Sequence, residues 1–513
     1  MLQNILLPSS APRSGTSSLR LLLTLLLLAI VPVAFGQAPT AIYGLVNVYR
    51  TTTAIPANTI GNNPAIPSYP KGTQTLVAID PATGLTFGSG NTSLPPFIVP
   101  IAGITAGQIL VGIDVRPSNG VLYGLGYDTV TTATQLYRLT PLTVAGNPTV
   151  VSGATAVAVG TAITLPLGNV SIAATSKRIG FDFNPAADAI RLVSANGRNY
   201  RLNANTGALA GTDGTLTYTG ANVSVPVVTV TGPASTAPPT SAGIGSVAYT
   251  NSQFAATSTQ LYAYDELDRG ILSQVPDPNS GVLTNPIAAS FFITGSASGQ
   301  GPYIITPKLV ALDIDFYYNR NTAQNTAYLI EVTADQPGGY HASNLYTLNT
   351  TNNLASRINS TFANPAVVPV TNPIINNTYA LDLIDIAAAI NAPLIWSGFV
   401  SDEWTNPLNW VPNRVPTIND DVLIPGTYTP GNPLSTSTFP GTTPTPNQPV
   451  VRLAGQVANS IRMNTVAVLT LVSPGTLQVA TNFINNGGTV NSNGGSLTVG
   501  GDFVNTNGTV NST

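Results

Sequence analysis

Few residues in this chain have the types and spacing that catalysis requires. Histidine occurs once, as His341, and cysteine does not occur among the 513 residues. A serine–histidine–aspartate relay would depend on that single imidazole. The absence of cysteine excludes disulfides, thiolate nucleophiles and thiolate zinc sites. We therefore expect His341 to be an exposed residue of the loop 336–343, and we expect no zinc site.

Acidic residues are the remaining candidates for chemistry. A glycosidase needs only two carboxylates, one of them often kept protonated by burial. Glutamate occurs only at Glu266, Glu331 and Glu403, and no acidic residue stands in a motif of that chemistry. Oxygen ligands for calcium could come from Asp313/Asp315, Asp265/Glu266/Asp268 or Asp182/Asp188, but these spacings match neither an EF-hand nor an Asp-rich nonapeptide loop. We prefer turn capping for these residues, and expect no cofactor, with calcium as the open alternative.

The densest polar group lies between residues 182 and 201. Its members are Asp182, Asn184, Arg191, Arg198 and Arg201. If 189–193 and 199–203 are paired strands, Arg191 and Arg201 share one sheet face because side chains alternate along a strand. The group could bind an anionic ligand or a sugar. The alternative, which we prefer, is that such arginines and acids tie neighbouring units of the fold together.

The composition is that of an exported β-protein. Charged residues make up 8% of the chain, against about 25% in ordinary globular proteins. Asn, Thr, Ser and Gly must therefore solvate the surface. The formal charge is −3, and no run of Lys or Arg provides the basic stripe that nucleic acid requires. Nucleic-acid binding is excluded as a function.

Residues 1–36 have the form of a secretory signal peptide. An apolar run, Leu21–Val33, follows Arg13 and Arg20 and leads into the small-residue site that ends at Gly36. The run is shorter than the roughly 20 residues that span a membrane as a helix. We expect cleavage before Gln37, no membrane span afterwards, and a secreted or cell-surface location.

A repeated strand unit fills residues 37–390. Short β-branched or aromatic runs alternate with turns rich in Gly, Pro, Asn and Asp. One short sequence motif, called the repeated phrase below, recurs about every 60 residues, with a longer last interval. Its leading residues are Leu76, Leu136, Tyr200, Leu261 and Leu345. Such periodicity favours a β-propeller of five or six blades over two stacked β-sandwiches. We expect 379–384 to pair with the strand near Ile42 and close the ring.

The sequences of these repeats resemble those of a known family. The relevant segments are 109–117 (ILVGIDVRP), 120–125 (GVLYGL), 180–185 (GFDFNP), 188–193 (DAIRLV), 199–207, 213–218 and 248–251. They are similar, in order, to a bacterial exported family called domain of unknown function 4394. The resemblance covers about 40–390. It implies a secreted, propeller-like domain and supplies no activity, and the long insertion at 313–341 departs from the family's more compact pattern.

The C-terminal third is built differently. Trp396, Trp404 and Trp410 fall close together in a segment, 391–449, that ends in a Pro- and Thr-rich loop from Gly426 to Pro449. This segment resembles the Trp-rich lead-in before β-helical regions of bacterial surface proteins of the Bacteroidetes type. The tryptophans could form an aromatic platform for sugars. We prefer the alternative, a small Trp-centred core that caps a solenoid.

Residues 450–513 have the repeat of a short right-handed β-solenoid. Phe483 and Val490 recur 20 positions later as Phe503 and Val510, with Asn and Gly between them. A solenoid coil has about this length, with apolar residues inward and Asn or Gly at the corners. The repeats reach residue 513 without a capping pattern. We therefore expect either that the protein is truncated there, or that a partner or self-association covers that edge.

The sequence thus predicts an all-β protein: a propeller-like domain, a small Trp-rich β module and a short solenoid. We expect a cell-surface or extracellular module for binding or adhesion, without catalytic activity, in which the propeller presents a binding face for a glycan or another surface ligand. Two other classes stay open. One is a secreted carbohydrate-active enzyme with paired carboxylates, and the other is a structural component of the envelope.

Overall fold

The computed structural model describes most of the chain after the first 38 residues. The described ranges are 39–51, 68–87, 99–144, 147–168, 179–218, 242–265, 271–288, 290–292, 309–320, 322–336, 340–358, 381–431 and 437–512. The expected signal peptide and its cleavage site lie outside them. Within these ranges, no helix is long and apolar enough to cross a membrane.

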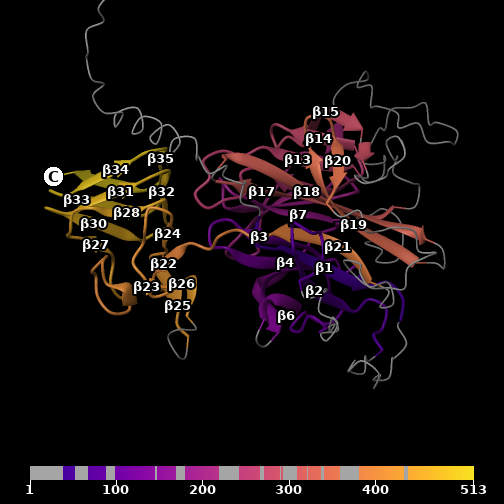
Figure 1. Ribbon diagram of the computed structural model, residues 1–513, viewed down its shortest axis with the longest axis horizontal. Coiled ribbons are helices and arrows are strands. Elements are labelled where there is room, and N and C mark those ends of the chain that lie inside the picture. Colours follow the sequence, from indigo (N-terminus) through magenta and orange to yellow (C-terminus); the bar gives the residue numbers. More distant parts are fainter. Residues whose placement is uncertain are drawn as a thin grey trace, which may run out of the picture.

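Antiparallel sheets form the first three blades of a propeller (Figure 1). From the innermost strand outward, blade 1 consists of β21 (Leu381–Ala388), β1 (Ile42–Val48) and β2 (Gln74–Ile79). Blade 2 consists of β3 (Ile109–Arg116), β4 (Val121–Tyr127), β5 (Ala133–Val144) and β6 (Asn147–Thr164). Blade 3 consists of β7 (Ile179–Asn184), β8 (Ala189–Ser194), β9 (Asn199–Asn203) and β10 (Leu209–Thr212).

The last two blades each gain a parallel outer strand. Blade 4 consists of β12 (Ile244–Tyr249), β13 (Leu261–Asp265), β14 (Ile271–Val275) and β15 (Val282–Ala288), with β11 (Thr217–Tyr218) parallel to β15. Blade 5 consists of β17 (Leu309–Asn319), β18 (Gln324–Gln336), β19 (Tyr340–Asn349) and β20 (Leu354–Arg357), with β16 (Ser290–Phe292) parallel to β20. The described residues therefore form five blades.

The ring is closed by strands from the two ends of the domain. The inner strands β21, β3, β7, β12 and β17 contact one another in a full circle. β21 pairs antiparallel with β1, so that Ile42 lies opposite Ala388. The expected closure near Ile42 is confirmed. Because this pairing ties residues far apart in sequence, it protects the edges that an open array would expose.

Glycines allow the inner strands to approach closely. A Cβ atom on Gly112 of β3 would lie 2.8 Å from the Cβ of Phe181 in the next blade. One on Gly180 of β7 would lie 3.0 Å from the backbone nitrogen of Val247 in blade 4. Larger side chains, such as Tyr123, Phe181 and Phe183, then fill the space between blades 2 and 3, in edge-to-face contacts of 5.3 and 5.7 Å between ring centroids.

The repeated phrase does not mark the same strand in every blade. Leu76, Leu136, Tyr200 and Leu345 lie on the third strand of blades 1, 2, 3 and 5, whereas Leu261 lies on the second strand of blade 4. The even spacing of the phrase hid this shift. Adjacent strands of a blade are buried in similar patterns, so the phrase alone does not give a strand's position.

The C-terminal unit is a β-solenoid with three faces, and each face is a sheet whose stacked strands run parallel to one another (Figure 1). One face contains β22 (Leu394–Trp396), β24 (Asp421–Ile424), β29 (Ser460–Met463), β32 (Phe483–Asn486) and β35 (Phe503–Thr506), with β23 (Trp410–Val411) antiparallel at its edge. The second contains β27 (Val450–Val451), β30 (Val468–Val472), β33 (Thr489–Asn493) and β36 (Thr509–Ser512). The third contains β28 (Gln456–Ala458), β31 (Thr476–Val479) and β34 (Ser496–Val499).

The 20-residue repeat is in register in the solenoid. Phe483 pairs with Phe503, and their rings stack with centroids 5.2 Å apart. The amide of Asn485 donates to the side-chain oxygen of Asn505 at 2.9 Å, which forms one rung of an asparagine ladder. Such ladders satisfy polar side chains at the corners of each coil. On the last described coil, the side chain of Phe503 is 43% exposed.

The Trp-rich segment is part of the solenoid. Trp396, Trp404 and Trp410 are buried. The rings of Trp396 and Trp404 each meet the ring of Trp410 edge-to-face, at 4.9 and 4.8 Å between centroids. A short 3-10 helix, η2 (Pro407–Asn409), leads into β23. The preferred expectation of a Trp-centred core is confirmed, and the tryptophans present no open platform for a sugar.

The Pro- and Thr-rich stretch, expected to be a loop, contains two paired strands. These are β25 (Thr427–Thr429) and β26 (Thr438–Pro444), which pair antiparallel. The aromatic rings of Phe399, Tyr428 and Phe439 pack against one another on this hairpin, with centroids 5.2 to 6.1 Å apart. Threonine favours strands, and this aromatic cluster supplies the burial that the composition alone did not reveal.

Candidate functional site

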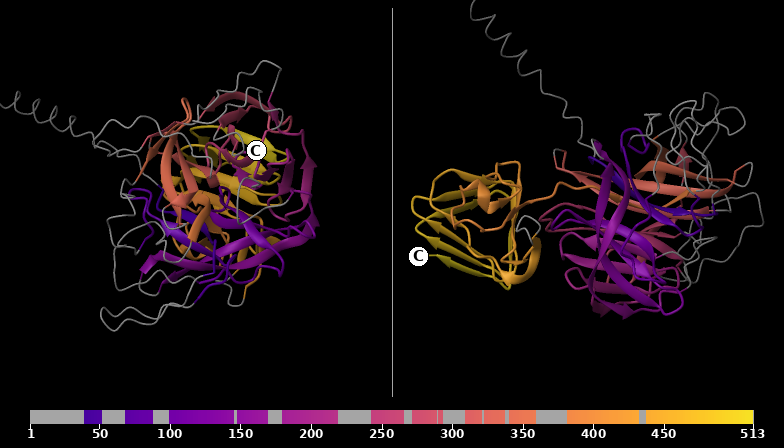
Figure 2. Two further views of the ribbon diagram at one scale, coloured as in Figure 1. Left: turned by 90° about the vertical axis from the view of Figure 1, so that its right-hand side faces the viewer. Right: turned by 90° about the horizontal axis from the view of Figure 1, so that it is seen from below.

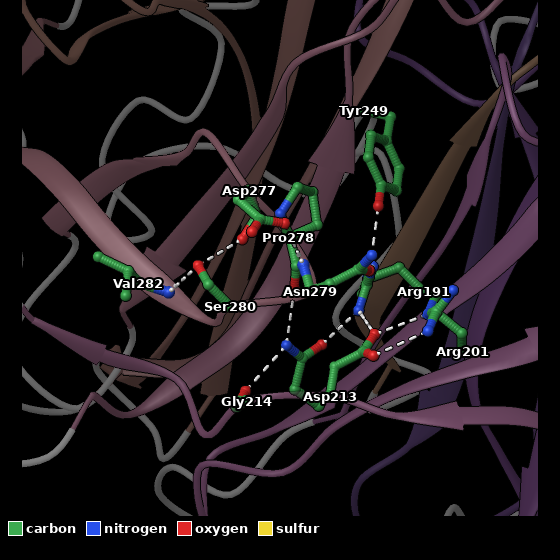
Figure 3. A network of polar contacts seen from close by, with 11 residues as sticks. Arg191, Arg201, Asp213, Gly214, Tyr249, Asp277, Pro278, Asn279, Ser280 and Val282 are labelled. Atoms are coloured by element: carbon green, nitrogen blue, oxygen red, sulfur yellow. Dashed lines mark hydrogen bonds and ion pairs between the residues drawn. The ribbon is translucent and has the colours of Figure 1, made fainter.

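The polar group singled out in the sequence joins blades 3 and 4 (Figure 3). The Arg191 guanidinium, on β8, donates to Asp213 at 2.6 Å and to Asn199 at 2.7 Å within its own blade. It also donates to Asn279 at 2.9 Å and to the Tyr249 hydroxyl at 3.3 Å, both in blade 4. Arg191 is buried, so its charge must be matched locally.

Arg201 lies beside Arg191, as the strand alternation predicted. The two residues are direct partners on β8 and β9, and the Arg201 guanidinium donates to the two carboxylate oxygens of Asp213 at 2.8 and 3.0 Å. One carboxylate therefore holds both arginines, and Asp213 is a member that sequence reasoning missed. Its Asp-Gly-Thr context is typical of a turn, so nothing in the local sequence indicated that Asp213 binds the two arginines.

The other three residues of the predicted group have different partners. The side-chain oxygen of Asn184 accepts from the backbone N–H groups of Ala186 and Ala187, in the turn after β7. Arg198 is exposed, and its side chain makes no hydrogen bond to the described residues. Asp182 lies directly opposite Arg191 on β7 and β8, and its carboxyl group also belongs to a ring around the propeller axis. The structure thus aligns Asp182, Arg191 and Arg201 across three strands, connects Asn184 to them through the Tyr249 hydroxyl, and leaves Arg198 apart.

A modest stability effect should follow from this arrangement. We expect Arg201→Gln to lower the free energy of unfolding by about 0.5 kcal/mol, because its side chain is 40% exposed and Asp213 keeps its bond to Arg191. Arg198→Gln is the matched control and should change nothing. Urea unfolding followed by far-UV circular dichroism measures both. A loss of several kcal/mol for Arg201→Gln would mean that the pair is not the weak, solvated one described.

The inner strands are joined by a cyclic set of hydrogen bonds. Each inner strand supplies one buried side chain that accepts from a backbone N–H of the next inner strand. Followed around the ring, the bonds run from Ile113 N to Asp385 (2.7 Å), Phe183 N to Asp114 (2.7 Å), Tyr249 N to Asp182, Ile314 N to Ser246 (3.0 Å) and Ile386 N to Asp313 (2.9 Å). Four carboxyl groups and one hydroxyl thus tie every blade to the next.

Burial raises the pKa of several carboxyl groups around the propeller axis. Burial, and then the charges of Asp315 and Asp313, hold the pKa of Asp114 well above its usual value. Burial and the charge of Asp114 do the same for Asp182. Burial raises the pKa of Asp315, which accepts from the backbone N–H of Ala388 at 2.6 Å, to about 7. The carboxyl groups therefore serve as partly neutral hydrogen-bond partners rather than as a set of free charges.

This ring corrects the expectation of turn-capping aspartates. The sequence predicts turn caps at Asp182, Asp313 and Asp315, with calcium ligands as the alternative, but all three lie on inner strands. Among the described residues, no group of three or more acidic or histidine side chains is placed to hold a metal ion. One signal for the ring was present in the sequence. An aspartate between apolar residues recurs in four of the five inner strands.

The remaining acids and the histidine are scattered. Glu331 is buried on β18 and accepts from the Tyr346 hydroxyl at 2.9 Å, and burial raises its pKa. Glu403 pairs with Arg452 at 2.7 Å in the solenoid unit. Glu266 and Asp268 lie outside the described residues. His341 falls within strand β19 rather than in the expected loop.

Asp188 contacts one arginine of the propeller and one arginine of the solenoid, and so links the two units. It lies in the turn between β7 and β8, where Arg116 donates to both of its oxygens at 2.8 and 2.6 Å. Arg462, on β29 of the solenoid, approaches the same carboxylate at 3.5 Å. The side chain of Arg462 is only 2% exposed, and its Nε and Nη1 atoms have no hydrogen-bond partner among the described residues.

Further contacts fix the solenoid on one face of the propeller (Figure 2). The β12–β13 loop meets β24 and β32 in an apolar patch that includes Phe254, Leu423 and Ile484. The Thr257 hydroxyl donates to Asp502 at 2.7 Å, and the Asn482 amide donates to the Ala255 carbonyl at 3.0 Å. Arg320, after β17, pairs with Asp421. The contacts come from the turns that follow the inner strands of several blades, so the solenoid covers that end of the ring.

The described residues define a class of protein, a closed five-bladed β-propeller with a β-solenoid docked on one face. Residues 85–370, more than half of the chain, match the family described as domain of unknown function (DUF4394), and the chain belongs to that family. The match spans blades 2 to 5, whereas β1, β2 and β21 lie outside it. A comparison with curated proteins finds no match.

Proposed function

We propose that the protein is an exported or cell-surface binding module without catalytic activity. In this proposal the propeller binds a glycan or another surface ligand, and the solenoid carries the propeller. The observation that supports it best is the docking of the solenoid onto one face of a closed ring. A fixed interface of charged, polar and apolar contacts makes the solenoid a support of defined orientation rather than a flexible tail.

The hydrogen bonds that the buried carboxyl groups make support a non-catalytic role. Hydrolysis of a glycosidic bond needs two carboxyl groups that face each other across the substrate. In the described residues, Asp114, Asp182, Asp313 and Asp385 each hold a backbone N–H of the neighbouring blade. Their positions are explained by ring closure alone. The apolar run at 21–33 is the basis for proposing export.

Glycan-array binding followed by a turnover assay tests this proposal. The probe is the chain from residue 37 to 513, applied to immobilised oligosaccharides of neutral, acidic and sulfated types. Binding without turnover is the expected result. Turnover that one carboxylate substitution abolishes would favour the enzyme instead, and a folded protein that binds nothing would favour a structural role in the envelope.

A further inference from the structure

A cleft of about 430 Å³ opens where the propeller and the solenoid meet. Its walls come from blades 4, 5 and 1 and from two loops of the solenoid. The residues used in the argument below are Gln253, Tyr318, Arg320, Asn391, Asn419 and Asn459. The volume lies within the range of about 300–1,000 Å³ that is typical of small-molecule sites. Neither unit forms this cleft alone.

The cleft is polar but carries no unmatched charge. Arg320 is the charged residue in the lining, and Asp421 pairs with it. Asn459 donates to the same Asp421 at 2.9 Å, which holds that wall in place. An anionic ligand would have to compete with Asp421 for the guanidinium. The lining therefore favours a neutral ligand.

Several amide side chains at the cleft are available to a ligand. The side chains of Gln253, Asn391 and Asn419 make no hydrogen bond to the described residues. Each amide presents a donor and an acceptor side by side. Sugar hydroxyl groups also donate and accept, so they match such amides. The half-buried Tyr318 adds a ring whose face is suited to the apolar side of a sugar.

We infer that this cleft at the junction of propeller and solenoid binds a short neutral saccharide. The inference rests on the proposed function and assigns it a site and a ligand class. It also gives the docked solenoid a second role, because Asn419 and Asn459 complete a site that the propeller only begins. Recognition would then require the two units to stay together.

Calorimetric titration of the 37–513 chain with neutral disaccharides and trisaccharides tests the inference. Asn391→Trp and Asn419→Trp place a large ring in the cleft at exposed positions whose side chains hold no internal bond. Asn413→Trp is the matched control, at an exposed asparagine of the solenoid unit outside the lining. We expect both cleft variants to weaken binding of at least one neutral saccharide tenfold or more, and the control to leave it unchanged.

A second variant separates the loss of a contact from blockage by bulk. Asn391→Ala removes only the amide and should weaken binding severalfold, with the melting temperature unchanged. If the wild type binds saccharides and all the cleft variants bind equally well, the cleft is not the site, although the proposed function stands. Preference for acidic or sulfated saccharides overturns the ligand class. Failure of the wild type to bind any saccharide overturns the inference and leaves the proposed function only with a ligand other than a glycan.

Discussion

Asp188→Asn is expected to destabilise the protein by about 3–5 kcal/mol, because it leaves two buried arginines without their counter-charge. Arg116 and Arg462 are 3% and 2% exposed, and both are directed at this one carboxylate. Burial alone would raise the pKa of Asp188, but the charges of Arg116 and then Arg462 outweigh it and lower that pKa. The asparagine keeps the shape and loses the charge.

The complementary change should have a much smaller effect. Arg462→Met is expected to cost about 1 kcal/mol or less, because Asp188 keeps its two bonds to Arg116. The Nε and Nη1 atoms of Arg462 have no partner among the described residues, so the methionine removes buried polar groups that already lack hydrogen bonds. The two variants thus differ although they touch the same contact.

Denaturant unfolding with two probes measures this asymmetry. The three tryptophans of the chain all lie in the core of the solenoid unit, so tryptophan emission reports that unit, while far-UV circular dichroism reports both units. Asp277→Asn is the matched control at an exposed turn and should stay within about 0.5 kcal/mol of the wild type. A loss for Arg462→Met as large as that for Asp188→Asn would contradict the assigned roles.

Sequence patterns located the strands well because burial dictates them. Runs such as Ile109–Arg116 and Val121–Tyr127 are apolar on both faces, as strands packed between neighbouring blades must be. The same property limited the prediction of blade position. In blade 4, Leu261 begins the phrase that elsewhere marks a third strand, and no periodicity distinguishes it.

The contacts that matter most for the site are those between distant residues. Strand alternation was enough to place Arg191 beside Arg201, because that relation is local. Asp213 and Asn279 reach Arg191 from separate turns, and Arg462 reaches Asp188 from another unit. Such partners depend on how blades and coils pack, which no local pattern encodes. The Trp core was predictable because three large apolar side chains in one short segment require burial together.

Stability should fall as the pH rises from about 5 to 8.5, because of the carboxyl ring. An aspartate in an unfolded chain has a pKa of about 3.9, whereas burial raises the pKa of Asp315 in the folded protein to about 7. Between these values the folded state holds a proton that the unfolded state has released. The stabilisation from Asp315 is therefore full below about pH 4 and is lost as the pH rises through 7.

The neighbouring carboxyl groups act in the same direction. Burial raises the pKa of both Asp114 and Asp182, and ionisation of each disfavours ionisation of the others. Asp188 acts in the opposite direction, since its lowered pKa gives stability that is lost as the pH falls below about 4. Maximal stability is thus expected near pH 4.

Urea midpoints at pH 5 and pH 8.5, at equal ionic strength, provide the measurement. The contribution of Asp315 over this interval is on the order of 3 kcal/mol, because only the pH units between 5 and 7 contribute. Asp315→Asn resembles the protonated acid, so it should reduce the difference between the two pH values while Asp114 and Asp182 retain the rest. Asp277→Asn, at an exposed turn, should leave the difference unchanged. Equal midpoints at both pH values in the wild type would mean that the ring carboxyl groups ionise without cost, and that the ring does not depend on protonated side chains.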